Sequence, residues 1–406
     1  VAMSGADLVL LNTGFAAAQL TEVVEAEGIG LVFHDDWFDD VVAELPPGST
    51  IGGAVLTARV DALVERSCRV TPPSAEGRTI LLTSGTTGRP KGAARSTGPA
   101  AAEGVAGMLA RIPLRPGDVQ VVPAPMFHAW GFSHLLLGLA RSATTVTSPR
   151  FDPAGTVELV ERHRARVLVA VPVMLQRILA LDDVDLAERL SSLDVVAASG
   201  SAMPGSVVQD WLDRVGPNLY NLYGSTEVAV ASVATPDDLA HDPRTAGRVV
   251  SGSTVEILDR NGEPVPAGET GRIFVGSSAR FDGYTGGGGK ESVRGLLSSG
   301  DLGHLDPDGL LFVDGREDDM IVSGGENLFP GPVEDALTSH PDVAEAAVVG
   351  VPDLEFGQVL AAHVVLRPGS RVSAHDLRDH VRGRVARFEV PKVVHLVDEL
   401  PRTTSG

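Results

Sequence analysis

A glycine- and hydroxyl-rich segment that ends on a lysine carries the strongest chemical signal in the sequence. It comprises Thr83, Ser84, Gly85, Thr86, Thr87, Gly88, Arg89, Pro90, Lys91 and Gly92. Glycines adopt positive φ freely, so backbone N–H groups can turn toward one point, where hydroxyls and an ammonium would suit phosphate oxygens. A Walker A loop is excluded, because Pro90 replaces its second glycine and Gly92 its metal-binding hydroxyl. The alternative, a solvated linker, is disfavoured because an apolar, strand-like run leads directly into the segment.

A second segment places a carboxylate beside hydroxyls. It reads Tyr220, Asn221, Leu222, Tyr223, Gly224, Ser225, Thr226 and Glu227. Glu227 follows two hydroxyls and a glycine turn, so it could hold a hard cation next to phosphates. The competing interpretation is an ordinary helix N-terminus with Ser225 as its cap. The residues alone leave both interpretations open.

A third segment suits a sugar. Asp301, within Ser299–Gly303, offers a bidentate acceptor for a ribose diol, and Arg316 offers a fixed fork of donors. Plain turn chemistry is the alternative, and it is our interpretation of Asp306 and Asp308. The sequence contains no HExxH, no GxGxxG after a strand and no GxSxG elbow. His128 is therefore predicted to be a pocket wall or a structural residue rather than a general base.

The elements around these segments indicate layers of α/β structure. Short apolar runs at Val119–Val122, Val167–Val171 and Leu193–Ala198 are typical of buried parallel strands. Helical patterns at Pro153–His163 and Val173–Ala180 lie between them. The alternation predicts a doubly wound α/β region in a large N-terminal domain.

Beyond about residue 247 the pattern changes twice. Strands predicted at Val255–Leu258, Arg272–Val275 and Leu310–Val313, with turns at Asn261-Gly262 and Asp306–Gly309, indicate an antiparallel barrel or small sheet. The last ninety or so residues are predicted to form a small α+β unit. Its elements are helices Val333–Thr338 and from Ser373 to about Phe388, and strands Glu345–Val349, Leu360–Leu366 and Val393–Val397.

Composition limits the possible partners. The 406 residues exceed one compact core, and the net charge of −20 argues against nucleic-acid or anionic-membrane partners. Cys68 is the only cysteine and is predicted to be a buried thiol. No apolar run approaches a membrane span and no basic signal-peptide region precedes Asp7, so a cytoplasmic location is expected. Only Lys91, Lys290 and Lys392 of the 33 basic residues are lysines, which hints at sites that need an ammonium; chance survival is the alternative.

In this order, the segments resemble the adenylate-forming superfamily of acyl-CoA synthetases, adenylation domains and luciferases. Thr83–Gly92 is similar to its phosphate loop, Asn221–Glu227 to its adenine and Mg²⁺ motif, Ser299–Gly303 to its ribose aspartate motif, and Gly315–Asn327 to its hinge region. The match covers nearly the whole chain. It implies a domain at residues 1–314, a hinge at 315–318 and a small mobile domain at 319–406.

The resemblance also implies a role for each matched residue. Catalytic roles fall to Lys91, Thr226, Glu227 (which would hold Mg²⁺) and the pivot Asp318. Nucleotide binding falls to Thr83, Ser84, Gly85, Thr86, Thr87, Gly88, Gly200, Ser201, Ala202, Asn221, Leu222, Tyr223, Gly224, Ser225, Asp301 and Arg316. An acyl pocket is implied at His128, Gly200 and Gly224, and a pantetheine tunnel at Gly324 and Gly325.

Three departures from the family pattern stand out. Val1 already falls inside the pattern, so about a hundred N-terminal residues are expected to be missing. Arg272 stands where an acidic residue is usual. The final motif, Leu400–Gly406, stops one residue before the expected catalytic lysine, and a trimmed or disordered end is our interpretation.

The expected activity is an acyl-CoA ligase that uses ATP, Mg²⁺ and coenzyme A, with a small-molecule carboxylic acid as substrate and a homodimer as a possible assembly. Residues near Phe127–Phe132, Val171–Met174 and Gly200–Met203 are mostly apolar, which favours a fatty or other apolar acid over an amino acid. The alternatives are an enzyme that loads a carrier protein or stops at acyl-AMP, and a non-catalytic nucleotide-binding protein. A P-loop NTPase is a distant third.

Overall fold

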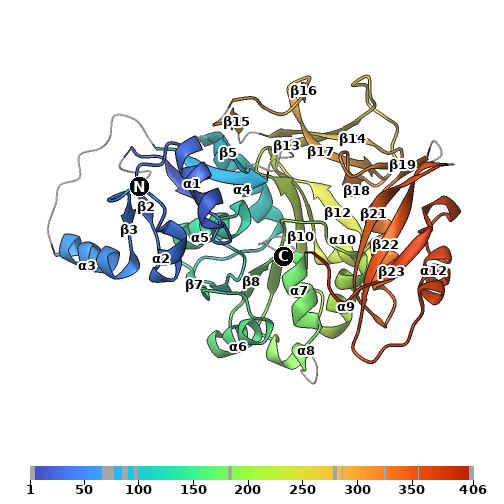
Figure 1. Cartoon of the computed structure of the whole chain (residues 1–406), viewed down its shortest axis with the longest axis horizontal. Coiled ribbons are helices and arrows are strands. Elements are labelled where there is room, and N and C mark those ends of the chain that lie inside the picture. Colours follow the sequence, from blue (N-terminus) through green and yellow to red (C-terminus); the bar gives the residue numbers. More distant parts are fainter. Residues whose placement is uncertain are drawn as a thin grey trace.

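The computed structural model describes residues 5–65, 77–84, 90–95, 99–181, 185–277, 281–285, 287–323, 326–354 and 356–401. A large N-terminal part combines α/β layers with an antiparallel region, and a small α+β part lies beside it (Figure 1). This arrangement confirms the predicted fold class. None of the helices in these ranges is long and apolar enough to cross a lipid bilayer.

In the parallel half of the main sheet, the two central strands are buried on both faces. Its strands are β6 (Val119–Val121), β7 (Thr144–Val146), β8 (Val167–Ala170), β9 (Val195–Ala198) and β10 (Leu219–Ser225). Val167 and Val169 face one core, whereas Leu168 and Ala170 face the other. Strands with two covered faces are predominantly apolar, which is why the sequences of β8 and β9 do not alternate between apolar and polar residues.

Helices cover both faces, as the predicted doubly wound layer requires. One face carries α6 (Pro153–His163), α7 (Pro172–Leu179), α8 (Leu186–Arg189) and α9 (Gly205–Arg214), and the other carries α4 (Pro99–Arg111) and α5 (Ala129–Ala140). Helix α6 has the predicted bounds because Asp152 caps it and Pro153 occupies its first turn. Trp211 of α9 and Trp130 of α5 are large buried side chains of the two opposite cores.

The antiparallel half continues the same sheet. Its strands are β11 (Ala229–Ala234), β12 (Thr245–Val249), β13 (Ser253–Leu258), β14 (Gly271–Ser277), β16 (Ser292–Val293), β17 (Leu296–Leu305) and β18 (Leu311–Arg316). The predicted turns hold, with Gly262 at φ +80° and Gly309 at φ +79°. Strand β12 pairs with β18 and β11 pairs with β10, so hydrogen bonds join the two halves directly.

A separate four-stranded sheet contains the phosphate segment. Its order is β1 (Leu8–Leu10), β4 (Thr79–Ser84), β5 (Pro90–Arg95) and β15 (Phe281–Tyr284). Strands β4 and β5 form a hairpin in which Thr83 pairs with Lys91. The remaining N-terminal elements are α1 (Ala17–Ala26), β2 (Val32–Phe33), α2 (Asp39–Val42), β3 (Thr50–Ile51) and α3 (Gly53–Val64). Cys68 lies outside the described residues, so its predicted burial stays a prediction.

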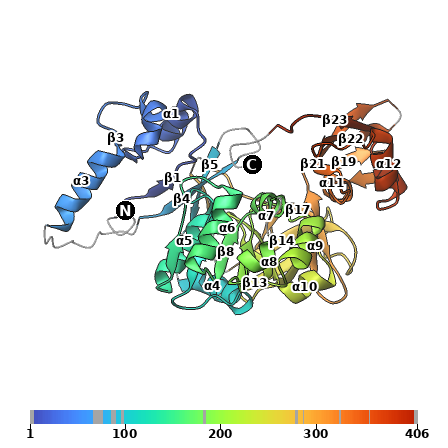
Figure 2. The same ribbon diagram turned by 90° about the horizontal axis from the view of Figure 1, so that it is seen from below.

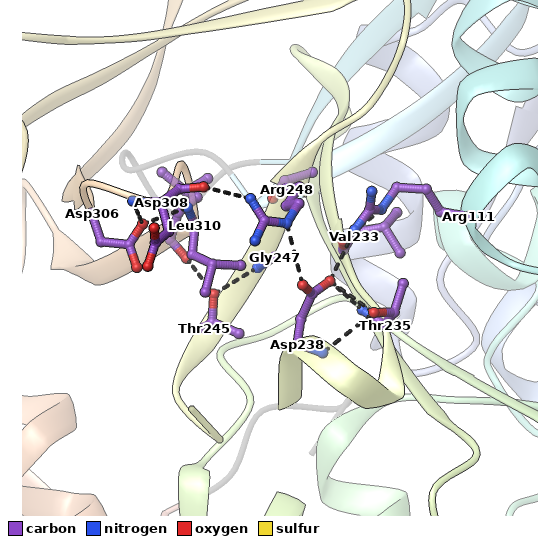
Figure 3. A network of polar contacts seen from close by, with 12 residues as sticks. Arg111, Val233, Thr235, Asp238, Thr245, Gly247, Arg248, Asp306, Asp308 and Leu310 are labelled. Atoms are coloured by element: carbon purple, nitrogen blue, oxygen red, sulfur yellow. Dashed lines mark hydrogen bonds and ion pairs between the residues drawn. The ribbon is translucent and has the colours of Figure 1, made fainter. Parts of the chain in front are cut away.

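A polar network ties helix α4 to the junction of the two sheet halves (Figure 3). Asp238, on α10 (Pro236–His241), accepts hydrogen bonds from Arg111 at 2.9 Å and from the cap residue Thr235 at 2.8 Å. Arg248 on β12 lies 3.4 Å from the same carboxylate and also bonds to the backbone of Asp308. Asp238 and Arg248 together therefore connect helix α4 to the turn at Asp308, two segments that are far apart in sequence.

The small part has its own core. It contains β19 (Ile321–Ser323), β20 (Glu326–Leu328), α11 (Pro330–Thr338), β21 (Val343–Asp353), β22 (Gly357–Leu366), α12 (Ala374–Arg382) and β23 (Val393–Leu396). Ser373 caps α12 as predicted, by accepting from the N–H of Asp376. The helix ends at Arg382, before the predicted Phe388, because Gly383 follows it and disfavours continuation.

Helix α11 docks the small part against the N-terminus of α9 (Figure 2). Pro204, the N-cap of α9, provides no side-chain cap, and the Asp335 carboxylate accepts from the Gly205 N–H at 3.3 Å instead. Ser206 and Thr338 also form a hydrogen bond across this contact, at 3.3 Å. A carboxyl group from one part thus caps a helix of the other by accepting a hydrogen bond from its first N–H group.

Docking should therefore depend on pH. Burial raises the pKa of the Asp335 carboxyl from 3.8 to about 6 in the docked form. The docked form binds the proton more tightly than an undocked, solvated one, so docking should strengthen as pH falls from about 6 to about 4 and should level off above that window. Energy transfer between dyes on the two parts would measure it.

The variant Asp335→Asn keeps an acceptor for Gly205 and removes the charge, so its docking should change little over the same pH range. Asp398→Asn, which neutralises an exposed carboxyl of the same part, is the matched control and should keep the wild-type dependence. An unchanged pH response in Asp335→Asn would contradict the assignment.

Candidate active site

One large cleft of about 3100 Å³ gathers residues from the second and third of the predicted segments. Its lining includes His128, Gly200, Ser201, Ala202, Asn221, Leu222, Tyr223, Gly224, Ser225, Thr226, Glu227, Asp301 and Arg316. The carboxyl ends of β9 and β10 open into it, and β17 and β18 return along its side. Crevices at the carboxyl ends of parallel strands are the usual ligand sites of open α/β sheets.

Part of the predicted site cannot be placed. Gly85, Thr86, Thr87, Gly88, Gly324 and Gly325 lie outside the described residues. Thr83 and Ser84 lie on β4 and Lys91 on β5, but their side chains lie outside the described part of the structure. Leu81 and Leu82 of β4 line the same cleft as Glu227 and Asp301, so the base of the hairpin opens toward it. Asp318 lies in an exposed turn between β18 and β19, away from the lining.

Glu227 stands in a turn between two strands. Residues 226–228 connect β10 to β11, and no helix begins there, so the helix-cap interpretation of Ser225 is wrong. The Ser225 hydroxyl instead accepts from the N–H groups of Glu227 and Val228, both at 3.2 Å, and donates to the Glu227 carboxylate at 3.0 Å. The turn aims a largely buried carboxylate, 8% exposed, at the cleft.

Asp301 is held by two donors. The Tyr223 hydroxyl donates to one carboxylate oxygen at 2.6 Å, and Arg316 donates to the other at 3.3 Å. Burial, and then the Asp301 charge, raise the pKa of Tyr223 well above its ordinary value, so the phenol stays a donor. Strands β17 and β18 pair Asp301 directly with Arg316, which fixes an acceptor and a fork of donors side by side.

Tyr284 was missed in the sequence. Its hydroxyl donates to the second oxygen of Glu227 at 2.8 Å, and burial followed by that bond raises the pKa of Tyr284. Next to it, the Thr285 hydroxyl donates to Glu27 at 2.7 Å, and Glu27 also accepts from the Gly92 N–H at 3.1 Å. No local sequence pattern marks Tyr284 or Thr285 as site residues. They come close to the site because strand β15 pairs with β5, which is distant in sequence.

Two basic residues, Lys290 and Arg272, lie near the predicted ribose segment. Lys290 donates to the backbone oxygen of Ser299 at 3.2 Å and lines the cleft. The scarcity of lysine in this chain was the one sequence signal that pointed to Lys290 as a possible site residue. Arg272, the departure from the family pattern, forms ion pairs with Glu291 and, at 3.1 Å, with Glu317, which directly follows β18.

The donors present fit a magnesium ion. Within the described ranges there is no group of three or more His, Cys, Asp or Glu that could hold a metal by itself. Mg²⁺ is bound through one or two carboxylates together with substrate phosphates and waters. Glu227 with its neighbouring hydroxyls, in a cleft that also opens to the phosphate hairpin, meets that requirement.

The other end of the cleft is apolar. Between residues 104 and 137 the described residues that line it include no Arg, Lys, Asp or Glu. His128 is half-buried there at the start of α5, its ring 4.4 Å from that of Phe127, and burial lowers its pKa. A ring-packed histidine that lines the cleft agrees with the predicted pocket wall.

Ala229 is strained at the edge of the site. Its φ is +62°, a conformation that L-residues disfavour, and it lines the cleft directly after the Glu227 turn. A Cβ on Gly224 would stand 1.9 Å from the Ala229 carbonyl oxygen, so this pair of strands requires glycine at 224.

Comparisons with known proteins agree on one family. The model of the AMP-binding enzyme family matches residues 1–285, and that of the AMP-binding enzyme C-terminal domain matches residues 332–406. The chain is 35% identical over 356 residues to an indoleacetate–CoA ligase of Aromatoleum aromaticum, covering 85% of this chain and 69% of that protein.

Two further relatives cover more of the chain. A feruloyl-CoA synthase of Amycolatopsis sp. is 34% identical over 410 residues, covering 99% of this chain and 82% of the relative. A fatty acid–[acyl-carrier-protein] ligase of Streptomyces coeruleorubidus is 31% identical over 427 residues, covering 100% and 81%. Among solved structures, ATP-bound MatB from Rhodopseudomonas palustris superposes with a TM-score of 0.87 at 27% identity, covering 100% of this chain and 82% of MatB.

Replacing the strained residue should stabilise the protein. Ala229→Gly removes the left-handed strain and should raise the free energy of unfolding by about 1 kcal/mol. Ala231→Gly, two residues along the same strand and fully buried, is the control and should lower it by a similar amount. Urea denaturation of both variants measures the difference, and a loss of stability in both would disprove strain at Ala229.

Proposed function

This chain belongs to the AMP-binding enzyme family, and we propose that it joins an apolar carboxylic acid to AMP at the expense of ATP and then transfers the acyl group to coenzyme A. One observation carries the proposal. A single cleft contains the carboxylate Glu227, the Asp301–Arg316 pair and an apolar pocket free of charged side chains along residues 104–137. The cleft therefore offers a carboxylate for the metal beside the phosphates, an acid–base pair for the ribose and an apolar pocket for the acyl group.

The first step needs no general base. A carboxylic acid is ionised at pH 7 and is its own nucleophile, so the half-buried histidine of the pocket need not act as a base. Its oxygen attacks the α-phosphorus of ATP, the bond to the bridging oxygen breaks, and pyrophosphate leaves with the electron pair. The barrier lies in positioning two anions and stabilising the departing charge.

The proposed roles follow from the contacts. Arg316 holds Asp301 beside it for the ribose hydroxyls, and Tyr223 packs along the adenine with Gly200, Ser201 and Ala202 near it. Glu227 holds Mg²⁺, which when bound would neutralise the phosphate charge. Thr226, Lys91 and the hydroxyls of the phosphate hairpin contact the phosphates, and losing one such preorganised donor typically costs about 10²–10³-fold in rate.

The second step requires a different arrangement. We assign residues 1–314 to a fixed domain, 315–318 to a hinge with Asp318 as pivot, and 319–406 to a mobile domain. The ion pair of Arg272 with Glu317 and the cap that Asp335 provides to α9 hold the present arrangement. Rotation about Asp318 would open these contacts and would bring Gly324 and Gly325 to the thiol path.

The apolar lining of the pocket and the names of the relatives favour an aryl acid as the first candidate substrate. Phe127, Trp130 and Phe132 line the pocket, and two of the three relatives described above are named for indoleacetate and ferulate. A fatty acid is the second candidate, since the third relative is named for one. Because that relative is named as a ligase for an acyl carrier protein, a carrier protein is the alternative acceptor of the acyl group.

Pyrophosphate exchange tests the proposal. Full-length protein with Mg²⁺·ATP should exchange labelled pyrophosphate in the presence of indole-3-acetate, ferulate or octanoate, and should form a thioester when free coenzyme A is added. Glycine is the control acid and should support no exchange, because its ammonium would be buried without a partner. Exchange without thioester would favour a carrier acceptor, and nucleotide binding without any exchange would favour the non-catalytic alternative.

The pivot is tested separately. Asp318→Pro fixes φ near −65° and restricts the preceding residue, so it should spare exchange within about threefold and reduce thioester formation at least about 100-fold. Asp319→Asn, at the neighbouring exposed position, is the control and should affect neither step. Equal losses of both half-reactions in Asp318→Pro would count against a pivot there.

A further inference from the structure

Helix α4 forms one wall of the apolar pocket, and two buried glycines lie on it in different surroundings. A Cβ on Gly107 would stand 2.1 Å from the Ser251 carbonyl oxygen, so the close backbone approach requires glycine there. Apart from its two chain neighbours and the backbone of its own helix, a Cβ on Gly104 would meet no heavy atom of the described residues within 4 Å. Packing therefore demands glycine at 107 but not at 104.

Backbone conformation does not demand it either. Gly104 is not among the described residues with positive φ, and it lies inside a regular helix. Glycine is the least favourable residue in a helix interior apart from proline. The chain thus keeps a destabilising residue at a buried position where a methyl group would fit.

The space beside Gly104 belongs to the cleft. Gly104 and Met108, one turn further along the same helix face, both line it. Met108 is 4% exposed and belongs to the same core cluster as Leu222. Val230 packs against this cluster and pairs with Gly224 of the neighbouring strand. The empty position is therefore continuous with the surface that would hold the acyl group.

This wall cannot easily retreat from a ligand. At the end of α4, Arg111 donates to the Val233 carbonyl at 3.1 Å and to Asp238 at 2.9 Å (Figure 3). Both partners belong to the junction of the sheet halves. A side chain added at 104 would have to occupy pocket volume.

We propose that Gly104 determines the size of the acyl group: its missing side chain admits the distal part of an apolar acid larger than benzoate. The proposal rests on the function above and deepens it. It predicts a preference for bicyclic or substituted aryl acids, or for medium-length aliphatic chains, over small acids.

The test compares acid profiles by pyrophosphate exchange in full-length protein. The probes are benzoate, cinnamate, ferulate and indole-3-acetate, together with butyrate, hexanoate and octanoate. Gly104→Leu should lower kcat/KM for the largest acids about 10–100-fold and leave benzoate and butyrate within about threefold, because each lost methylene-sized space costs roughly tenfold or more. Gly104→Ala should show the same trend more weakly.

Stability separates a pocket role from a structural one. Gly104→Ala should raise the thermal midpoint, since alanine favours the helix and the space is free. Ala106→Leu, on the exposed face of the same helix, is the matched control and should keep the wild-type profile. An unchanged profile in Gly104→Leu, equal losses for all acids, or a lower midpoint in Gly104→Ala would overturn the inference. A wild-type protein that exchanges with no acid would overturn the proposed function itself.

Discussion

The site depends on strand β15, which joins two sheets that are otherwise separate. It pairs with β5 of the phosphate hairpin, and its last residue, Tyr284, donates to Glu227 in the turn that follows β10. The neighbouring Thr285 and Glu27 fix the backbone at Gly92, where a Cβ would stand 2.6 Å from the threonine hydroxyl. A carboxylate for the cation and a hairpin for phosphates are thereby held at a set distance before any ligand arrives.

The need to hold Glu227 and the phosphate hairpin together explains why β15 pairs with the N-terminal sheet and not with the main sheet. A cation carboxylate beside phosphate donors is useful only if both are rigid, since preorganisation is what lowers a barrier made of charge. The structure achieves rigidity by letting a strand from the antiparallel half cross over to the N-terminal sheet. The pairing of β10 with β11 beside Glu227 is also tight: Ala229 has a left-handed backbone, and a Cβ on Gly224 would clash with the Ala229 carbonyl oxygen.

The small part relates to this rigid core differently. Among the described residues, its contacts with the large part include hydrogen bonds such as that of Asp335 with Gly205, and its apolar core cluster contains residues of the small part alone. Weak, polar contacts of this kind can be exchanged for others, which suits a proposed reaction whose two steps require different groups in the same space. The fixed half would hold the nucleotide while the exchangeable half serves each step in turn.

The sequence by itself determined the local features. Apolar runs without alternation identified β8 and β9, Asp152 and Pro153 set the start of α6, and the order of the glycine, glutamate and aspartate segments identified the family. These depend on near neighbours and on period, which a single sequence displays. The turn at Glu227 was open between two interpretations, because a serine before an acid can cap a helix or close a strand turn.

Only the tertiary structure decided the rest. It joined the α/β and antiparallel halves into one sheet, brought Tyr284 to Glu227 and Arg272 to Glu317, and showed that Gly104 and Gly107 differ. Each of these depends on atoms that are distant in sequence and adjacent in space. Long-range pairing leaves no periodic trace in the residues concerned, so no reading of local pattern could have found it.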